Sequence, residues 1–276
     1  MAFRRLKIPR ELEVACVDVG PLLRASAPPL VLLHGVGADR REWFLTLPAL
    51  ARRRRVIAFD LLGHGLSSKP SGAGVVYRTR LLADAVVAGI EALPDPPACV
   101  DLLGHSLGGA VALDVVRQHP RLVDRLVLVD SAGLPPARSL SLLAMSLPFV
   151  PASYEDSKRL LQTSVNVKLF HHPLVAFAAS RYKRRMKNRA QLMSLLAAMA
   201  SGQDAMTPRD LARVRHETLI LWGDDDRIFP LETGRALCRA LPNARLEILP
   251  RCGHVAPTER PVSFVRRVEA FLKRER

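Results

Sequence analysis

The chain has 276 residues, of which 41 are Lys or Arg and 26 are Asp or Glu, so its formal net charge is +15 at pH 7. No segment approaches the roughly 18 consecutive apolar residues that a membrane span requires, and the first residues lack the apolar run of a signal peptide. The four cysteines show neither paired spacing nor a metal-ligand motif: Cys16, Cys99, Cys238 and Cys252. We therefore expect a cytoplasmic protein with reduced thiols.

The positive charge raises the question of nucleic-acid binding. The run Arg52–Arg55 directly precedes a predicted strand, at the carboxyl end of a helix, where cations are favourable. No helix-turn-helix, zinc-finger or aromatic RNA-binding pattern is interleaved with the basic residues. We therefore expect no nucleic-acid partner, while contact of the basic surface with acidic ligands or an anionic membrane stays open. The sequence does not indicate an oligomeric state.

Strand and helix signals alternate along most of the chain, as a mostly parallel sheet flanked by helices requires. Strands are predicted at Glu11–Val19, Pro21–Ala27, Leu30–His34, Arg55–Asp60, Cys99–Leu103, Arg125–Val129, Thr218–Trp222 and Arg245–Leu249. Helices are predicted at Arg40–Ala51, Leu81–Leu93, Ala110–Gln118, Leu231–Leu241 and Pro261–Lys273. The central strands are apolar runs without alternation, which indicates a sheet that is covered on both faces.

One segment, residues 134–214, interrupts this alternation and has a helical pattern. We therefore divide the chain into a core, at residues 1–133 and 215–276, and a helical insertion. Every methionine except Met1 lies in the insertion, and thioethers suit an adaptable apolar pocket as well as plain packing. The insertion has 12 Lys and Arg against four Asp and Glu, many of them at Arg181–Arg189. Either a solvated helix face or a rim that attracts anionic substrates accounts for this charge.

The most informative segment of the chain is Val100–Gly109. An apolar strand runs directly into the pattern G-x-S-x-G, with serine at position 106, and a helix follows. This layout predicts a nucleophile elbow, a sharp turn that exposes the hydroxyl of Ser106. Gly104 and Gly108 are needed because backbone segments approach one another closely in such a turn. The start of the helix directs unpaired N–H groups toward a developing oxyanion.

A serine nucleophile needs a base, which in turn needs an orienting acid. Five of the eight histidines follow Ser106. Only His254 lies in a loop directly after a predicted strand, where open α/β sheets place functional groups. We therefore predict His254 as the base. The other four lie at a helix end, in an apolar stretch with prolines, or before a strand: His119, His171, His172 and His216.

The acid has two candidates, and each follows a predicted strand. Asp226 lies in the loop after Thr218–Trp222, and Asp130 ends Arg125–Val129. Three adjacent carboxylates, Asp224–Asp226, cannot all point inward, so the first two are expected to form the turn. We favour Asp226 and keep Asp130 as the alternative.

Taken together, these segments resemble an α/β-hydrolase-fold serine hydrolase over nearly the whole chain outside the insertion. The segments that carry the resemblance occur in the family's order: Leu30–Gly37, Phe59–Ser67, the elbow, Trp222–Arg227, and Gly253-His254 followed by Glu259-Arg260-Pro261. The resemblance implies that Ser106 is the nucleophile, His254 the base and Asp226 the acid. It also implies an oxyanion hole from the backbone N–H groups of Leu107 and Val36.

The same resemblance makes residues 134–214 a helical cap domain over the site, and it requires no cofactor and no metal. His64 and His105 match positions that are usually structural in this family. Serine at the elbow argues against haloalkane dehalogenases and epoxide hydrolases, which use aspartate there.

We predict a carboxylesterase that cleaves small-molecule esters of short-to-medium acyl chains through an acyl-enzyme. One alternative is a carbon–carbon bond hydrolase of ring-fission products. That class usually has tryptophan after the catalytic histidine, where this chain has Val255, and its oxyanion loop is richer in glycine and proline. A cap arginine could still bind a substrate carboxylate: Arg181, Arg185 or Arg189. A second alternative is a non-enzymatic ligand sensor, although a binding module has no need of a nucleophile, a base and an acid.

Overall fold

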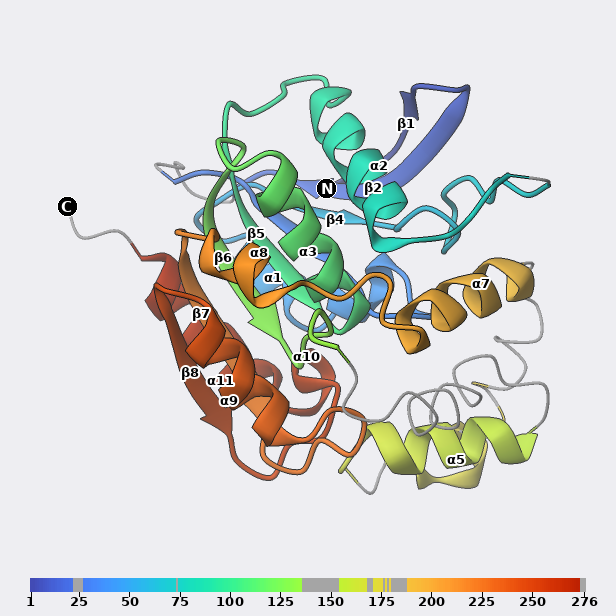
Figure 1. Cartoon of the computed structure of the whole chain (residues 1–276), viewed down its shortest axis with the longest axis vertical. Helices are drawn as coiled ribbons and strands as arrows, with labels where there is room; N and C mark the ends of the chain where they lie inside the picture. The colour runs from blue at the N-terminus through green and yellow to red at the C-terminus, as the bar shows by residue number, and fades with distance from the viewer. Residues whose placement is uncertain are drawn as a thin grey trace.

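The computed structural model describes residues 1–21, 27–72, 74–135, 154–167, 171–175, 177, 179 and 188–273. Its centre is a twisted sheet of eight strands with helices on both faces (Figure 1). The strands are β1 (Ala2–Ile8), β2 (Leu12–Val19), β3 (Leu30–Leu33), β4 (Val56–Phe59), β5 (Val100–His105), β6 (Val123–Val129), β7 (Glu217–Gly223) and β8 (Ala244–Leu249). This architecture confirms the predicted α/β-hydrolase fold.

The strand order is β1-β2-β4-β3-β5-β6-β7-β8. The first two pairings, β1 with β2 and β2 with β4, are antiparallel, and the remaining pairings are parallel. The carboxyl ends of β5, β7 and β8 therefore meet at one edge, which is the edge where the elbow, the Asp226 loop and the His254 loop begin.

Helical segments cover the sheet and its functional edge. They are η1 (Arg40–Trp43), α1 (Leu47–Leu50), α2 (Thr79–Glu91), α3 (Leu107–Gln118), α5 (Tyr154–Ser164), α7 (Arg189–Ala200), α8 (Pro208–Ala212), α9 (Leu231–Ala240), α10 (Ala256–Glu259) and α11 (Pro261–Leu272). Within the described residues no helix is long and apolar enough to cross a membrane.

The apolar core has two layers, one on each face of the sheet. In β3, Val31 and Leu33 pack into the layer that contains residues of α2, α3 and α9, whereas Leu30 and Leu32 pack into the layer of α1 and α11. Successive side chains of a strand point to opposite faces, so a strand that is covered on both sides must be apolar throughout. The predicted cover on both faces is confirmed.

The amino-terminal edge differs from the prediction. A strand at Ala2–Ile8 was not expected, and it pairs with β2 across a turn in which Arg10 and Glu11 have φ of 66° and 57°. Residues with positive φ are usually glycine or asparagine. Because this turn has two charged residues instead, no sequence signal indicated a hairpin. Of the strand predicted at Pro21–Ala27, positions 22–26 lie outside the described residues.

The single helix predicted at Arg40–Ala51 is two short ones, η1 and α1. Pro48 lies in the first turn of α1, where its missing N–H needs no partner. In the interior of one continuous helix, the same proline would remove a hydrogen bond and clash with the preceding turn. The chain therefore interrupts the helix before Pro48.

Residues 134–214 contain α5, α7 and α8, in keeping with the helical pattern of this segment. Figure 1 shows α5 outside the two core layers, on the side at which the parallel strands end. In contrast, α7 buries Leu192, Leu195 and Leu196 in the same apolar layer as α2. Met145, Met186 and positions 181–187 of the basic segment lie outside the described residues.

Candidate active site

Ser106 lies in a sharp turn between β5 and α3, with φ of 51° and ψ of −116°. Two glycines allow this turn. A Cβ on Gly104 would lie 2.2 Å from the carbonyl oxygen of Gly108, and a Cβ on Gly108 would lie 2.2 Å from that of Leu33. The positive φ of Ser106 is a strained conformation for a residue with a side chain, and such strain is found mainly at functional sites.

The side chains of Ser106, His254 and Asp226 form a continuous hydrogen-bonded chain. His254 Nε2 lies 3.0 Å from Ser106 Oγ, and His254 Nδ1 lies 2.8 Å from Asp226 Oδ2. All three residues are buried. A carboxylate at Nδ1 makes this nitrogen the donor, so Nε2 has a free lone pair toward the serine hydroxyl. The structure thus brings together three groups that the sequence placed on three separate loops.

Asp226 is held rigidly from its other side. Its Oδ1 accepts the N–H groups of Ile228 at 2.8 Å and Phe229 at 3.0 Å. Both oxygens of the carboxylate therefore have partners, and Oδ2 is directed at His254. Because the three donors converge on one carboxylate, its orientation is defined before any substrate binds.

Asp130, the alternative acid, has a different role in the structure. Its Oδ1 accepts the N–H of Gly223 at 2.8 Å, so it joins the ends of β6 and β7. Burial raises the pKa of Asp130 well above its ordinary value, and the nearby negative charge of Asp226 adds to this effect. Of the two candidates, it is therefore Asp226 whose carboxylate contacts His254, whereas Asp130 contacts the backbone of Gly223.

Two backbone N–H groups beside Ser106 donate to no group of the residues that the structure describes. Within the described residues, neither Leu107, at the start of α3, nor Val36 donates its N–H to a hydrogen bond, although both residues are buried. The loop that contains Val36 is held by His34, whose Nε2 accepts the N–H of Leu61 at 3.0 Å. Its Nδ1 is therefore protonated and donates to the carbonyl of Gly35 at 2.8 Å. Buried N–H groups without partners are rare, and here they are available to an oxyanion.

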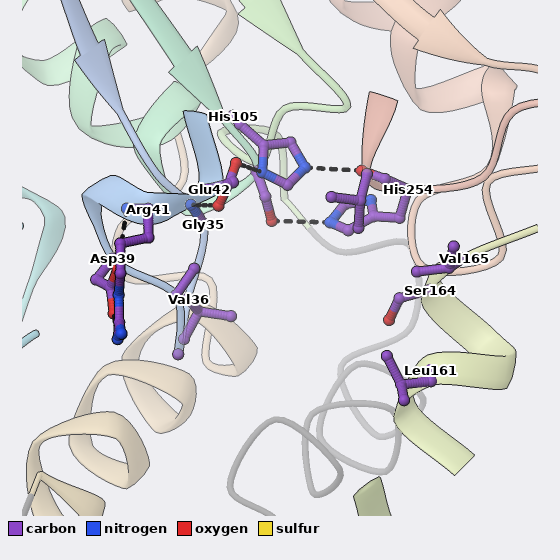
Figure 2. A pocket seen from close by; sticks show the side chains of 14 residues that line it. Gly35, Val36, Asp39, Arg41, Glu42, His105, Leu161, Ser164, Val165 and His254 are labelled. Carbon is purple, nitrogen blue, oxygen red and sulfur yellow. Dashed lines mark hydrogen bonds and ion pairs between the residues drawn. The ribbon is translucent and has the colours of Figure 1, made fainter. Parts of the chain in front are cut away.

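A buried ion pair, which the sequence did not predict, lies beside Ser106. His105 Nδ1 lies 2.6 Å from Glu42 Oε1, and its Nε2 donates to the carbonyl of His254 at 2.7 Å (Figure 2). Glu42 Oε2 accepts the N–H of Gly35 at 3.1 Å. Burial alone would lower the pKa of His105, but the carboxylate of Glu42 raises it to about 9. Burial alone would raise the pKa of Glu42, but the positive charge of His105 holds it below its ordinary value.

This imidazolium connects the oxyanion loop, the elbow and the His254 loop. The family resemblance implies a structural role for His105. The structure adds that the imidazole is charged and that Glu42 is its partner. Glu42 lies 63 positions away from His105 in the sequence, so no local pattern could have paired them.

A cavity of about 460 Å³ opens beside Ser106 and His254. Figure 2 shows Val36 on one side of it, and Leu161, Ser164 and Val165 from the end of α5 on the other. The lining is mainly apolar, as is common for small-molecule sites. No described methionine lines this cavity, and Met199 and Met206 pack into the core layer instead. For those two residues the structure favours packing over a role in an adaptable pocket.

Other candidate groups of the sequence lie away from the reacting atoms. His171 Nε2 bonds to the carbonyl of Val165, and His216 Nε2 bonds to that of Pro120. Cys252, two positions from His254, is fully buried, and burial raises the pKa of its thiol. A buried thiol with a raised pKa is not nucleophilic at neutral pH, so Cys252 is a packing residue.

Residues 28–261 match the family described as alpha/beta hydrolase fold, and the chain belongs to this family. It is a hydrolase. The 2-hydroxymuconate semialdehyde hydrolase of Pseudomonas sp. strain CF600 is 32% identical over 96% of this chain and 94% of its own length. The 2-hydroxy-6-oxo-2,4-heptadienoate hydrolase of Pseudomonas putida is 30% identical over 98% of this chain and 96% of its own length.

One solved structure is also similar to this chain over nearly its whole length. The serine hydrolase involved in carbazole degradation has a TM-score of 0.82 and 26% identity, with 98% of each chain covered. The similarity of all three proteins therefore extends over nearly the whole chain.

Proposed function

We propose that the protein cleaves a carbon–carbon bond in ring-fission products, by addition of Ser106 to a ketone. The observation that carries this proposal is the similarity, over nearly the whole chain, to two hydrolases of oxo-dienoate and semialdehyde compounds. It favours the alternative of the sequence analysis over the carboxylesterase. The substrate class is a 2-hydroxy-6-oxo-2,4-dienoate, a small anionic molecule.

Ser106 is the proposed nucleophile, with His254 as base and Asp226 as acid. His254 Nε2 removes the proton of Ser106 Oγ as this oxygen adds to the carbonyl carbon C6, and Asp226 stabilises the imidazolium that forms. The N–H groups of Leu107 and Val36 stabilise the resulting oxyanion, each contributing about 3 kcal/mol. The contacts of 3.0 and 2.8 Å support these roles.

The carbon–carbon bond then breaks because its electron pair has somewhere to go. In the keto tautomer of the substrate, C5 is a methylene between the C6 ketone and an alkene conjugated with the C2 ketone. Cleavage of C5–C6 places the electron pair on a dienolate that extends to the C2 oxygen, and His254 returns its proton to this leaving group. The acyl group stays on Ser106 until water, deprotonated by His254, releases the carboxylic acid. One water is consumed in total, and no cofactor or metal takes part in this scheme.

The cavity supports a substrate with an apolar acyl end. Leu161 and Val165 of α5 line it opposite Val36. We propose that residues 134–214 act as a cap that contributes this wall, because α5 lies in that segment. Each buried CH₂ of the acyl group contributes about 0.8 kcal/mol until the cavity is full.

Ester hydrolysis is the second candidate, and one residue favours it. Val255 follows His254, where carbon–carbon bond hydrolases usually have tryptophan. The same nucleophile, base and oxyanion donors serve both reactions, so the choice depends on the cavity.

The test compares two substrates on one enzyme preparation. Loss of the chromophore of 2-hydroxy-6-oxohepta-2,4-dienoate is followed beside release of p-nitrophenol from p-nitrophenyl butyrate. We expect kcat/KM to be higher by orders of magnitude for the dienoate, and both activities to vanish in Ser106→Ala. Efficient ester cleavage without dienoate cleavage would assign an esterase, and wild type inert to both substrates would refute the proposed carbon–carbon bond hydrolysis and favour a non-enzymatic ligand sensor.

A further inference from the structure

Glu259, at the end of α10, is a buried carboxylate whose described partners are all backbone N–H groups. It is 6% exposed. Its Oε1 accepts the N–H of Val255 at 3.1 Å, and its Oε2 accepts those of Gly253 at 3.1 Å and Asn166 at 2.7 Å. A buried carboxylate is costly unless it is hydrogen-bonded, so these three donors are what makes its burial tolerable.

The donors belong to two parts of the chain that lie far apart in the sequence. Gly253 and Val255 flank His254, whereas Asn166 follows α5 in the cap. A second contact joins the same parts, because His254 N–H donates to the carbonyl of Ser164 at 2.8 Å. The two backbones also lie against each other without room for a side chain, since a Cβ on Gly253 would be 2.9 Å from Ser164 O.

We propose that Glu259 is a positioning residue, which fixes the main chain around His254 to residues 164–166 of the cap. The proposal rests on the proposed roles of Ser106 and His254. Among the described contacts, Glu259 has no hydrogen bond to Ser106 Oγ or to the imidazole of His254. It acts through the backbone on both sides of the histidine, so it determines where Nε2 lies relative to the serine hydroxyl and where the cavity wall of α5 lies relative to both.

The substitution Glu259→Gln removes part of this arrangement in a defined way. The amide keeps one acceptor oxygen and gains an NH₂ group. This NH₂ group faces a backbone N–H, and because both are donors they form no hydrogen bond. With its oxygen at the Oε2 position, the amide loses the bond to Val255. With its oxygen at the Oε1 position, it loses the bonds to Gly253 and Asn166. Either orientation releases one side of the Glu259 network while the side-chain volume stays the same.

The measurement is the second-order rate at which a fluorophosphonate labels Ser106, well below the melting temperature of each variant. Labelling needs the nucleophile and its base but no natural substrate. We expect Glu259→Gln to label about 10-fold more slowly and Glu259→Ala about 100-fold more slowly, since a displacement of about 1 Å costs this much in rate. For hydrolysis we expect kcat to fall while KM changes little.

The matched control is Glu247→Gln on β8. Glu247 contacts the guanidinium groups of Arg245 at 3.5 Å and Arg267 at 3.3 Å, and it has no contact with the His254 loop. This control should label at the wild-type rate. Glu259→Asp, which keeps the charge but is one methylene shorter, should stay well below wild type.

Several outcomes would overturn the proposal. Folded Glu259→Gln protein that labels at the wild-type rate would show that Glu259 serves stability alone, and full recovery in Glu259→Asp would assign its effect to charge instead of placement. Wild type that is labelled at Ser106 but cleaves no dienoate would refute the proposed substrate while the labelling comparison still tests Glu259. Wild type that is not labelled at Ser106 would refute both.

Discussion

Replacing Asp226 by asparagine tests the proposed acid most sharply, because the structure fixes how the new amide must lie. Asp226 Oδ1 accepts two N–H groups, from Ile228 and Phe229, and Oδ2 accepts one from His254. The amide oxygen of the variant therefore stays on the two backbone donors, and its NH₂ group faces His254 Nδ1. Nδ1 must then accept a hydrogen bond, which moves the ring proton to Nε2. In this tautomer His254 cannot take the proton of Ser106.

The size of the effect follows from those contacts. Restoring the productive tautomer requires turning the amide, which leaves two N–H donors opposed by an NH₂ group at a cost of about 1–3 kcal/mol each, or about 2–6 kcal/mol in total. Loss of the negative charge beside the imidazolium adds to this cost. We expect kcat to fall about 10⁴-fold, as it does when the acid of a comparable triad becomes an amide. This corresponds to about 5 kcal/mol in activation free energy.

The assay is dienoate hydrolysis together with fluorophosphonate labelling, at neutral pH and at equal concentrations of folded protein. Asp225→Asn is the matched control, because Asp225 is the adjacent carboxylate and is paired with Arg227 on the surface. It should retain wild-type rates. Asp130→Asn should lower kcat far less than Asp226→Asn does. Folded Asp226→Asn with near-normal kcat, or a larger loss in Asp130→Asn, would refute the assignment of the acid.

Three further predictions concern the elbow and its surroundings. Ser106→Gly should lose all activity. Its free energy of unfolding in urea should be about 1 kcal/mol higher than that of Ser106→Ala, since glycine tolerates φ of 51° without strain. Equal free energies of unfolding would show that Ser106 is not strained. Gly104→Ala should cost about 3 kcal/mol or more because its Cβ would meet Gly108 O, whereas Gly20→Ala, with nothing within 4 Å, should cost little. The pKa of His105 is raised from 6.5 to about 9, so its contribution to stability is complete below pH 6.5 and is lost as pH rises through about 9. Glu42→Gln should therefore flatten the decline of melting temperature over that range, and an unchanged pH profile would show that the pair is not charged.

The sequence alone was sufficient to predict the fold and the turn that presents Ser106, because both have local signatures. A G-x-S-x-G pattern between an apolar strand and a helix defines the turn at Ser106, since only glycine fits where an added Cβ would lie 2.2 Å from a backbone oxygen. The apolar strands showed without any structure that the sheet is covered on both faces. His254 was predicted as the base for a similar reason, by its position directly after a strand.

Contacts between distant segments could not be inferred in this way. The choice between Asp226 and Asp130 depends on which carboxylate reaches His254, and both follow strands that end at the same edge of the sheet. The contacts of Glu42 with His105 and of Glu259 with Asn166 join residues 63 and 93 positions apart. Such pairs have no periodicity to reveal them, because hydrogen bonds of buried charges are formed by whichever groups packing brings together. The sequence thus determined most of the elements and the position of the turn at Ser106, and the tertiary structure decided which charged groups hold them in place.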